Sequence, residues 1–446
     1  MTRLSSLLAA SVLVLASVAP AQGAAAMTYA EEAAPLSAAQ REATVADIIR
    51  LVEQRYVFPD RVPAMTSRLR EALAAGRYDG AASAVFAQQV TEDLREASGD
   101  RHMYLSYSPA EYAAATADGG EEDEGPALAA LRAREAERTN HGLSEMRILP
   151  GNVRYLRITG FRWVEDRTGF AYDDALRFLR DGDAVVIDLR GNGGGSHAAV
   201  RYLLSHFMDG GELDITFLQA GEEPMQSRTL EHLPAGRLKG KPLYVLISRQ
   251  VGSAAEAFAY DVQQFHLGAL VGATTSGAAN NNAVVPVAPA FMLSVSQGRP
   301  VHPVSGTNWE GVGVAPDVAV DPAKALDEAQ ALALAGLLAR TDADPAACAE
   351  WRWAQVGVAA RLNPVSAPPA RLRPLAGVYG GRRIVFRDGG LVWIRSNGQE
   401  AKLTPMTTDG LFAVDGYEDR FRMRLSGDAL ETQWIDETAP SRFARD

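Results

Sequence analysis

The fold is decided by the stretch Ile187-Asp188-Leu189-Arg190-Gly191-Asn192-Gly193-Gly194-Gly195-Ser196. Its pattern is an apolar strand, then a glycine-rich loop, then a helix over Ala198–Met208. Backbone amides in such a loop can bind an anion. The Gly-Lys-Ser/Thr ending of a phosphate loop is absent, and Ser196 stands where a dinucleotide fingerprint needs its third glycine. The remaining interpretation is a loop whose amides stabilise an oxyanion.

A second strand, turn and helix surrounds Val251-Gly252-Ser253. Here a serine stands at a helix N-terminus just beyond the end of a strand, where the helix dipole and a free amide can bind negative charge. The spacing Ser253-x-x-Glu256 is equally that of a capping box, which would make the serine purely structural. Both interpretations stay open at this point.

Strands alternate with helices on either side of these motifs. This order predicts an α/β core built on crossover connections. The expected strands are Asn152–Gly160, Ala184–Leu189, Leu243–Ser248 and Ala269–Thr274, and the expected helices are Tyr172–Arg180, Ala198–Met208 and Ala254–His266.

The chain before the core has helical spacing of apolar residues from Gln40 to about Leu105 and is predicted to form a bundle of three helices. A strand is expected over Met103–Tyr107, just after Asp100-Arg101-His102. Acidic residues among glycines indicate a solvated loop over Ala113–Gly125.

The chain after the core is predicted to be helical over Lys324–Ala339 and Pro345–Leu362, followed by a proline-rich linker. Turn pairs and short strand-like runs over Gly377–Arg445 indicate a small all-β module. The expected domains are a signal peptide (1–26), a helical bundle with the acidic loop (27–140), the α/β core (141–340), a helix and linker (341–370) and the β module (371–446).

The charge balance excludes several classes of partner. There are 44 basic and 55 acidic residues, a net charge of −11, so the basic footprint of a nucleic-acid or anionic-lipid binder is missing. Cys348 is the single cysteine, which excludes an intramolecular disulfide and a multi-cysteine metal site. The seven histidines show no HExxH spacing. We expect no cofactor and no metal.

The first residues are predicted to be a secretory signal. Arg3 precedes an uncharged apolar run, Leu4–Ala19, and small residues at Ala19-Pro20-Ala21 or Ala24-Ala25-Ala26 offer a cleavage site. The run is shorter than the roughly 20 apolar residues of a spanning helix, so no stable membrane span is expected. The mature protein is therefore expected to be periplasmic or secreted.

The ordered set of motifs resembles the tail-specific (C-terminal processing) family of serine peptidases. The motifs are DLRGNGGGS (188–196), VGSAAEAFAY (251–260), GATTSG (272–277) and NWEGVGVAPD (308–317). Together with YVFP (56–59) and DRHM (100–103), they resemble the branch of interphotoreceptor retinoid-binding protein and tricorn core, without a PDZ domain. The resemblance implies a Clp-protease/crotonase-like core and peptide or protein substrates.

The resemblance also implies the catalytic roles. Ser253 matches the nucleophile, His102 the base and Glu310 the carboxylate that orients the base, a combination suited to nucleophilic catalysis. The commoner serine–lysine dyad is not available, because no lysine occurs between Lys241 and Lys324. The implied oxyanion hole consists of the Ala254 amide and the amide of Gly193 or Gly194.

Two departures from the family pattern affect these assignments. Arg101 stands where a serine precedes the histidine in the tricorn type, and Val251-Gly252 replaces the usual Thr-Ala before the nucleophile. The main alternative is a non-catalytic protein that binds a hydrophobic ligand or a peptide on the same fold. A nucleotide-binding module is a weaker alternative that depends on the glycines alone, and the oligomeric state is not predicted.

Overall fold

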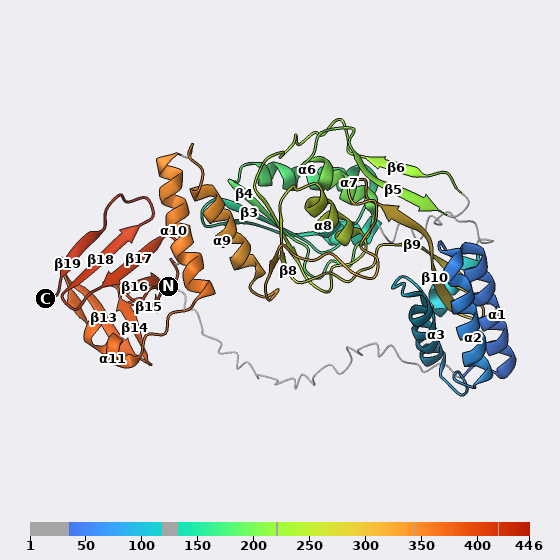
Figure 1. Cartoon of the computed structure of the whole chain (residues 1–446). Helices are drawn as coiled ribbons and strands as arrows, with labels where there is room; N and C mark the ends of the chain where they lie inside the picture. Colours follow the sequence, from blue (N-terminus) through green and yellow to red (C-terminus); the bar gives the residue numbers. More distant parts are fainter. Residues whose placement is uncertain (1–34, 118–132, 220–221, 343, 418) are drawn as a thin grey trace, which may run out of the picture.

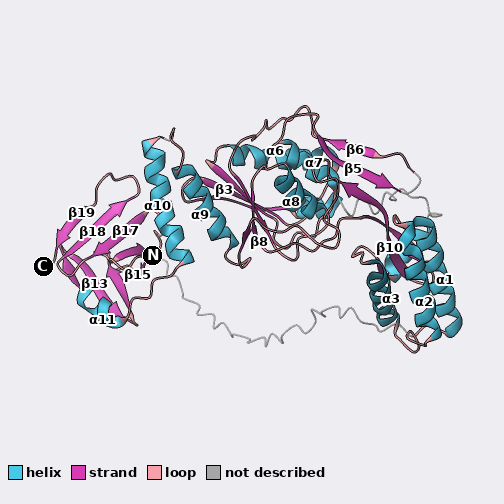
Figure 2. Ribbon diagram, in the orientation of Figure 1, coloured by secondary structure: helices cyan, strands magenta, loops and turns pink. Residues whose placement is uncertain are grey.

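A computed structural model describes residues 35–117, 133–219, 222–342, 344–417 and 419–446 (Figures 1 and 2). The expected signal peptide and most of the expected acidic loop lie outside these residues. In the described part of the chain, no helix is long and apolar enough to cross a membrane.

The centre of the molecule is a six-stranded sheet in the order β11-β8-β7-β4-β3-β2. All neighbouring pairs are parallel except β2 and β3. The strands are β2 (Leu143–Leu149), β3 (Val153–Ile158), β4 (Ala184–Asp188), β7 (Leu243–Ile247), β8 (Ala269–Gly272) and β11 (Val318–Ala319). The predicted α/β core is therefore confirmed.

Helices cover both faces of this sheet (Figure 1). Val185 and Ile187 of β4 point to the core beneath α6 (Glu165–Arg180), α7 (His197–Ser205) and α8 (Ala254–Gln264). Ala184 and Val186 point to the opposite core, under α9 (Ala325–Leu338) and α10 (Pro345–Leu362). Both faces of β4 are buried, which explains its continuous apolar run.

The two glycine-containing loops lie at one edge of the sheet because their strands are parallel neighbours. Asp188, the last residue of β4, pairs with Leu246 of β7. The loop after β4 leads into α7, and the loop after β7 leads into α8. The carboxyl ends of adjacent parallel strands are the usual place for a ligand site in an α/β sheet.

A second, five-stranded sheet was not predicted. Its order is β1-β10-β5-β6, with β9 also paired to β10, and every pair is antiparallel. The strands are β1 (Tyr104–Tyr107), β5 (Leu213–Gln219), β6 (Met225–Arg228), β9 (Asn281–Val287) and β10 (Phe291–Val301). The central strand β10 is covered on both sides over its first six residues, and its second half contains Gly298 and Pro300, which are unusual inside a strand and hide it in the sequence.

The N-terminal helices are α1 (Ala38–Arg55), α2 (Val62–Ala74) and α3 (Ser83–Ser98). They do not form a self-contained bundle, because their core includes Phe291, Leu293 and Val295 of β10. The following helix, α4 (Pro109–Ala117), extends into the stretch expected to be a loop from Ala113 onward. Short 3-10 helices lie at Pro59–Arg61, Asn140–Gly142 and Arg373–Leu375.

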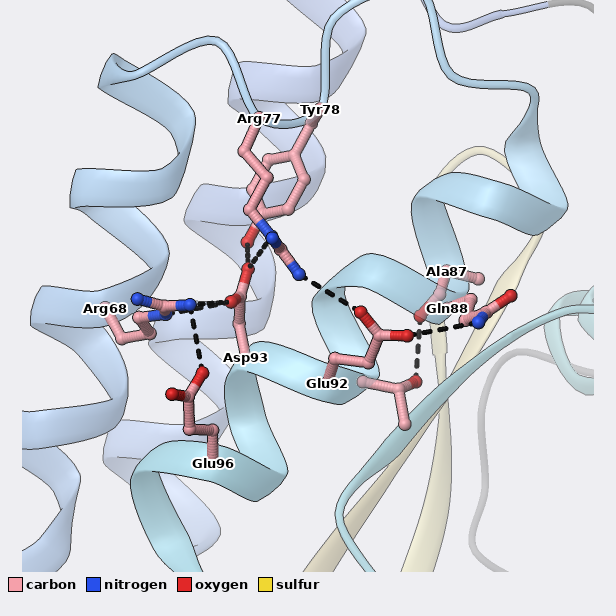
Figure 3. A network of polar contacts seen from close by, with 9 residues as sticks. Arg68, Arg77, Tyr78, Ala87, Gln88, Glu92, Asp93 and Glu96 are labelled. Atoms are coloured by element: carbon pink, nitrogen blue, oxygen red, sulfur yellow. Dashed lines mark hydrogen bonds and ion pairs between the residues drawn. The ribbon is translucent and has the colours of Figure 1, made fainter.

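A polar network ties α2 and α3 together around Asp93 (Figure 3). The buried Asp93 carboxylate accepts hydrogen bonds from Arg68 Nε at 2.8 Å, Arg77 Nε at 3.0 Å and the Tyr78 hydroxyl at 2.7 Å. These three donors satisfy the buried charge, so the network holds the helices in place.

The C-terminal module is an antiparallel meander of the strands β12 to β19, as the sequence predicted an all-β module. A bridge between Tyr379 and Arg445 joins its first and last strands and closes it into a barrel. The strands are Gly377–Tyr379, Arg382–Arg387, Gly390–Ile394, Glu400–Pro405, Leu411–Val414, Phe421–Leu425, Ala429–Trp434 and Ser441–Ala444. The short helix α11 (Pro369–Leu372) precedes them.

Candidate active site

Ser253 occupies a strained turn between β7 and α8. Its backbone has φ 50° and ψ −123°, a conformation that a residue with a side chain rarely adopts. The turn has the geometry of a capping box, in which the hydroxyl faces the Glu256 amide and the Ser253 amide donates to Glu256 Oε2 at 3.0 Å. Strain of this kind costs about 1–3 kcal/mol and is characteristic of serine nucleophiles on strand-to-helix turns. A simple helix cap would not require it.

The turn opens onto a cavity of about 230 Å³. Ser253 and Ala254 form part of its wall, with Gly195 from the glycine-rich loop. The remaining lining residues are His197, Ile215, Phe217, Ala257, Ala279, Asn280, Asn281, Asn282, Pro300 and Trp309. The cavity therefore lies between the edge of the central sheet and the second sheet, with Ser253 accessible from it.

The glycine-rich loop packs directly against the serine turn. Gly194 has φ 110°, and a Cβ built on it would lie 2.8 Å from both Ser253 Cβ and the Gly252 carbonyl oxygen. Gly195 has φ 134°, and its Cβ would lie 2.1 Å from the carbonyl oxygen of Phe161. A larger residue at position 194 would push the glycine-rich loop away from the serine turn, and one at position 195 would push it away from Phe161.

The structure distinguishes the amides that were considered for the oxyanion hole. The Gly194 amide donates to Asn192 Oδ1 at 2.9 Å. The Gly193 and Ala254 amides make no hydrogen bond to any described residue. The pair available for an oxyanion is therefore Gly193 and Ala254.

Glu256 is a residue whose importance the sequence did not reveal beyond its capping position. Its side chain is fully buried and its carboxylate joins the serine turn to the loop after β8. The donors are the Ser253 amide (3.0 Å), the Thr275 hydroxyl (2.5 Å), the Ser276 hydroxyl (3.1 Å), the Gly277 amide (2.6 Å) and the Ala278 amide (2.8 Å). One carboxylate thus fixes two walls of the site.

We expect Glu256→Gln to lower both stability and activity. The side-chain NH₂ of glutamine would face hydrogen-bond donors that the carboxylate now satisfies. Each buried donor left without an acceptor would cost about 1–3 kcal/mol of stability. A shift of the serine turn by about 1 Å would lower kcat by roughly a hundredfold. Chemical denaturation and peptide-cleavage kinetics measure the two effects, with Glu71→Gln on the exposed face of α2 as a control. Unchanged values for both would show that Glu256 is dispensable.

Glu310 holds the other end of the same loop. Its Oε2 accepts hydrogen bonds from the amides of Ala279 at 2.6 Å and Asn280 at 2.9 Å, and its Oε1 accepts one from the Arg101 amide at 3.4 Å. Burial and the neighbouring Asp100 carboxylate raise the pKa of Glu310, and the three amides partly oppose that shift. Glu310 is therefore linked to the cavity wall through Ala279 and Asn280.

His102 lies beside Glu310. The side-chain atoms of Asp100, His102 and Glu310 that could bind a ligand all lie within 4.8 Å of one another. His102 Nδ1 is buried and has no hydrogen-bond partner among the described residues, and burial lowers the pKa of the imidazole. Within the described ranges there is also no hydrogen bond between Ser253 and His102. The structure therefore brings the expected base, His102, next to the expected carboxylate, Glu310, without a hydrogen bond between either residue and Ser253 in the described part of the chain.

Asp100 was not predicted as part of the site. Its carboxylate is buried and accepts from the Tyr56 hydroxyl at 3.2 Å, the Asn280 side-chain amide at 2.9 Å and the His102 amide at 2.9 Å. The carboxylates of Asp100 and Glu310 already accept hydrogen bonds from several donors, so this cluster fits a hydrogen-bonded array better than a metal site.

The two lysines before Ser253 in the sequence, Lys239 and Lys241, have partners elsewhere in the fold. Lys241 donates to the carbonyl oxygens of Arg180 and Gly182, next to the start of β4. Ser253 follows the carboxyl end of β7, which is the opposite edge of the sheet. Lys239 pairs with Asp209.

Comparisons with known proteins agree with the motifs. Residues 152–320 match the model of peptidase family S41, and residues 24–141 match the N-terminal domain of Peptidase_S41 in eukaryotic IRBP. The chloroplastic C-terminal processing peptidase of Tetradesmus obliquus is 27% identical over 169 residues, which are 38% of this chain and 35% of that protein. The match thus spans about a third of the relative's own length.

Several solved structures are partly similar. Mature CPAF has a TM-score of 0.49 at 14% identity, covering 69% of this chain and 99% of that one. A lipoprotein from Streptococcus agalactiae has a TM-score of 0.45 at 17% identity, covering 66% and 96%. The tricorn protease has a TM-score of 0.42 at 12% identity, covering 65% and 35%.

Both family models follow the order of the motifs along the chain. The N-terminal model ends at residue 141, just before β2, and the peptidase model spans the strands and loops that carry Gly193, Ser253 and Glu310. Through residues 152–320, and with the matching N-terminal domain before them, this chain belongs to peptidase family S41.

Proposed function

We propose that the chain is an exported serine-type peptidase that cleaves peptides or protein C-termini, with Ser253 as nucleophile, His102 as base and Glu310 as the orienting carboxylate. The observation that carries the proposal is the Ser253 turn. A strained serine at a helix N-terminus faces a cavity and stands next to two backbone amides that have no hydrogen-bond partner among the described residues. These are the parts that acyl transfer requires.

The proposed reaction follows from these positions. His102 removes the proton of the Ser253 hydroxyl as the oxygen attacks the carbonyl carbon of the scissile amide. The amides of Gly193 and Ala254 donate to the resulting oxyanion. The C–N bond then breaks, and His102 returns the proton to the leaving amine. A water molecule, activated by His102, hydrolyses the acyl-serine ester and regenerates the enzyme.

Glu310 would act through His102. The buried Nδ1 of the imidazole has no hydrogen-bond partner in the described part of the chain, and the Glu310 carboxylate is within 4.8 Å of the histidine. A hydrogen bond from Nδ1–H to that carboxylate would fix the tautomer and stabilise the imidazolium formed during attack. Catalytic hydrogen bonds are often long in the absence of substrate and shorten when it binds.

The cavity beside Ser253 does not favour a carrier function at that site. Its volume of about 230 Å³ is below the roughly 300–1,000 Å³ of typical small-molecule pockets. A carrier would also gain nothing from the strained conformation of Ser253. Purified protein should therefore hydrolyse a peptide mixture, and a serine-reactive inhibitor should stop hydrolysis while a chelator should not. Binding of a hydrophobic ligand without any hydrolysis would favour the carrier.

Export is the other part of the proposal. The apolar run Leu4–Ala19 after Arg3 supports cleavage of a signal peptide, and the mature chain should begin between Gln22 and Met27. N-terminal sequencing of protein from the periplasm or medium measures this directly. A native protein that starts at Met1 in the cytoplasm would contradict export without affecting the assignment of Ser253.

A further inference from the structure

A second cavity lies between α10 and the C-terminal barrel, on a different part of the molecule. It measures about 540 Å³, and its wall includes Arg352 and Trp353 of α10 and Arg422, Arg424 and Glu431 of the barrel. Helix α10 packs on α9, on the face of the central sheet opposite α6, α7 and α8. The cavity shares no lining residue with the one at Ser253.

Arg422 is the unusual group in this cavity. It is only 4% exposed, and its guanidinium lies 4.1 Å from the centre of the Trp353 ring. One nitrogen, Nη2, donates to the carbonyl oxygen of Trp353. Its Nε is buried and has no hydrogen-bond partner among the described residues. Burial lowers the pKa of this arginine to about 10. A buried cation with an unpartnered donor is costly unless an anion approaches it.

The charges around Arg422 indicate how many negative charges a ligand would carry. Arg424 is paired with Asp409, and Glu431 lies 3.7 Å from Arg442. Asp419 is the acidic group whose charge acts on Arg422. Arg352 is exposed and lines the cavity. Arg352 and Arg422, opposed by one carboxylate, leave about one unit of positive charge for a ligand.

Apolar side chains complete the wall. Val356 of α10 and Leu411 of β16 face the same space as the arginines, together with Pro440. The volume is that of a small organic molecule and exceeds the space that a single inorganic ion would fill. A ligand that fits both the arginine side and the apolar side of the cavity has one anionic end and one apolar arm.

We propose that this cavity binds a monocarboxylate with an apolar arm, its carboxylate on Arg422 and Arg352 and its arm against Val356 and Leu411. Arginine suits the acidic end, because its planar N–H groups bind carboxylate oxygens in pairs. The same chemistry is offered by a free aliphatic acid and by the C-terminal residue of an apolar peptide. The inference does not depend on the proposed peptidase activity.

Isothermal titration calorimetry on the full chain tests this inference. Decanoate should bind with one-to-one stoichiometry, and decanol, which has the same arm without the charge, should bind at least tenfold more weakly. Arg352→Gln and Arg422→Gln should each weaken decanoate binding at least tenfold. Arg383→Gln, on an exposed position of β13 in the same barrel, is the matched control and should bind as wild type does.

Further variants keep the test decisive. If Arg422→Gln fails to fold, Val356→Trp, which would fill the apolar part, should abolish binding with the barrel intact. The source of the carboxylate is identified on the Ser253→Ala chain, which should not cleave peptides. There the affinity for an apolar peptide with a free C-terminus is compared with the affinity for its C-terminal amide and with that for decanoate. Equal affinities for decanoate and decanol, or unchanged binding by folded Arg352→Gln and Val356→Trp variants, would overturn the proposal.

Discussion

Replacing Ser253 by alanine is expected to lower kcat/KM for peptide cleavage by about four to six powers of ten without unfolding the protein. The loss is large because the variant has no oxygen to attack the substrate carbonyl. At most one helix cap is lost with the hydroxyl, which costs about 1 kcal/mol, so the variant should stay folded. Steady-state kinetics and thermal unfolding measure the two effects on the same sample.

Ser37 provides the matched control for this substitution. It is the N-cap of α1 in a complete capping box, its hydroxyl accepting from the Gln40 amide at 3.3 Å. Ser37→Ala should cost about 1 kcal/mol of stability and leave activity unchanged. If Ser253→Ala behaved like Ser37→Ala in both measurements, Ser253 would be a cap and the peptidase assignment would fail.

Replacing His102 by glutamine is the second change with a large expected effect, and the pH profile identifies its cause. The base must be neutral to accept the serine proton, so activity should rise with pH through the pKa of His102. Burial lowers that pKa, which means that the neutral form persists below the reference value of about 6.5. The acid limb of kcat/KM is therefore expected below pH 6.5, and His102→Gln should lose about three powers of ten in kcat/KM.

The lysines supply the control for the pH experiment. Lys241→Arg keeps a cation next to the carbonyl oxygens of Arg180 and Gly182, and the activity of this variant should be nearly unchanged. An activity limb near pH 10, or loss of activity in Lys241→Arg, would instead indicate an amine base. Either result would remove His102 from the mechanism.

The elements that were predicted correctly are those with a strong local pattern. The apolar run of β4 and the helical spacing of α3 and α8 are visible in short windows of sequence. The second sheet was missed because its strands are paired across large distances in sequence: β1 pairs with β10, which in turn pairs with β5. The partner of each strand, and hence the burial of both faces of β10, is a property of the tertiary structure alone.

Some site residues could likewise be recognised from a local sequence pattern, whereas others required the tertiary structure. Ser253 and Gly193 stand out because a turn after a strand has a recognisable composition. Glu256 does not, because its capping position explains it fully until the hydrogen bonds to Thr275 and Gly277 are seen. Asp100 likewise requires the fold, since Tyr56 and Asn280 reach it from distant segments.

The most direct test of the central claim is mass-spectrometric mapping of the wild-type protein after reaction with a fluorophosphonate. The account predicts a single adduct on the peptide that contains Ser253, formed more slowly in His102→Gln and absent in Ser253→Ala. An adduct on a different serine, or equal labelling of the wild type and Ser253→Ala, would contradict it.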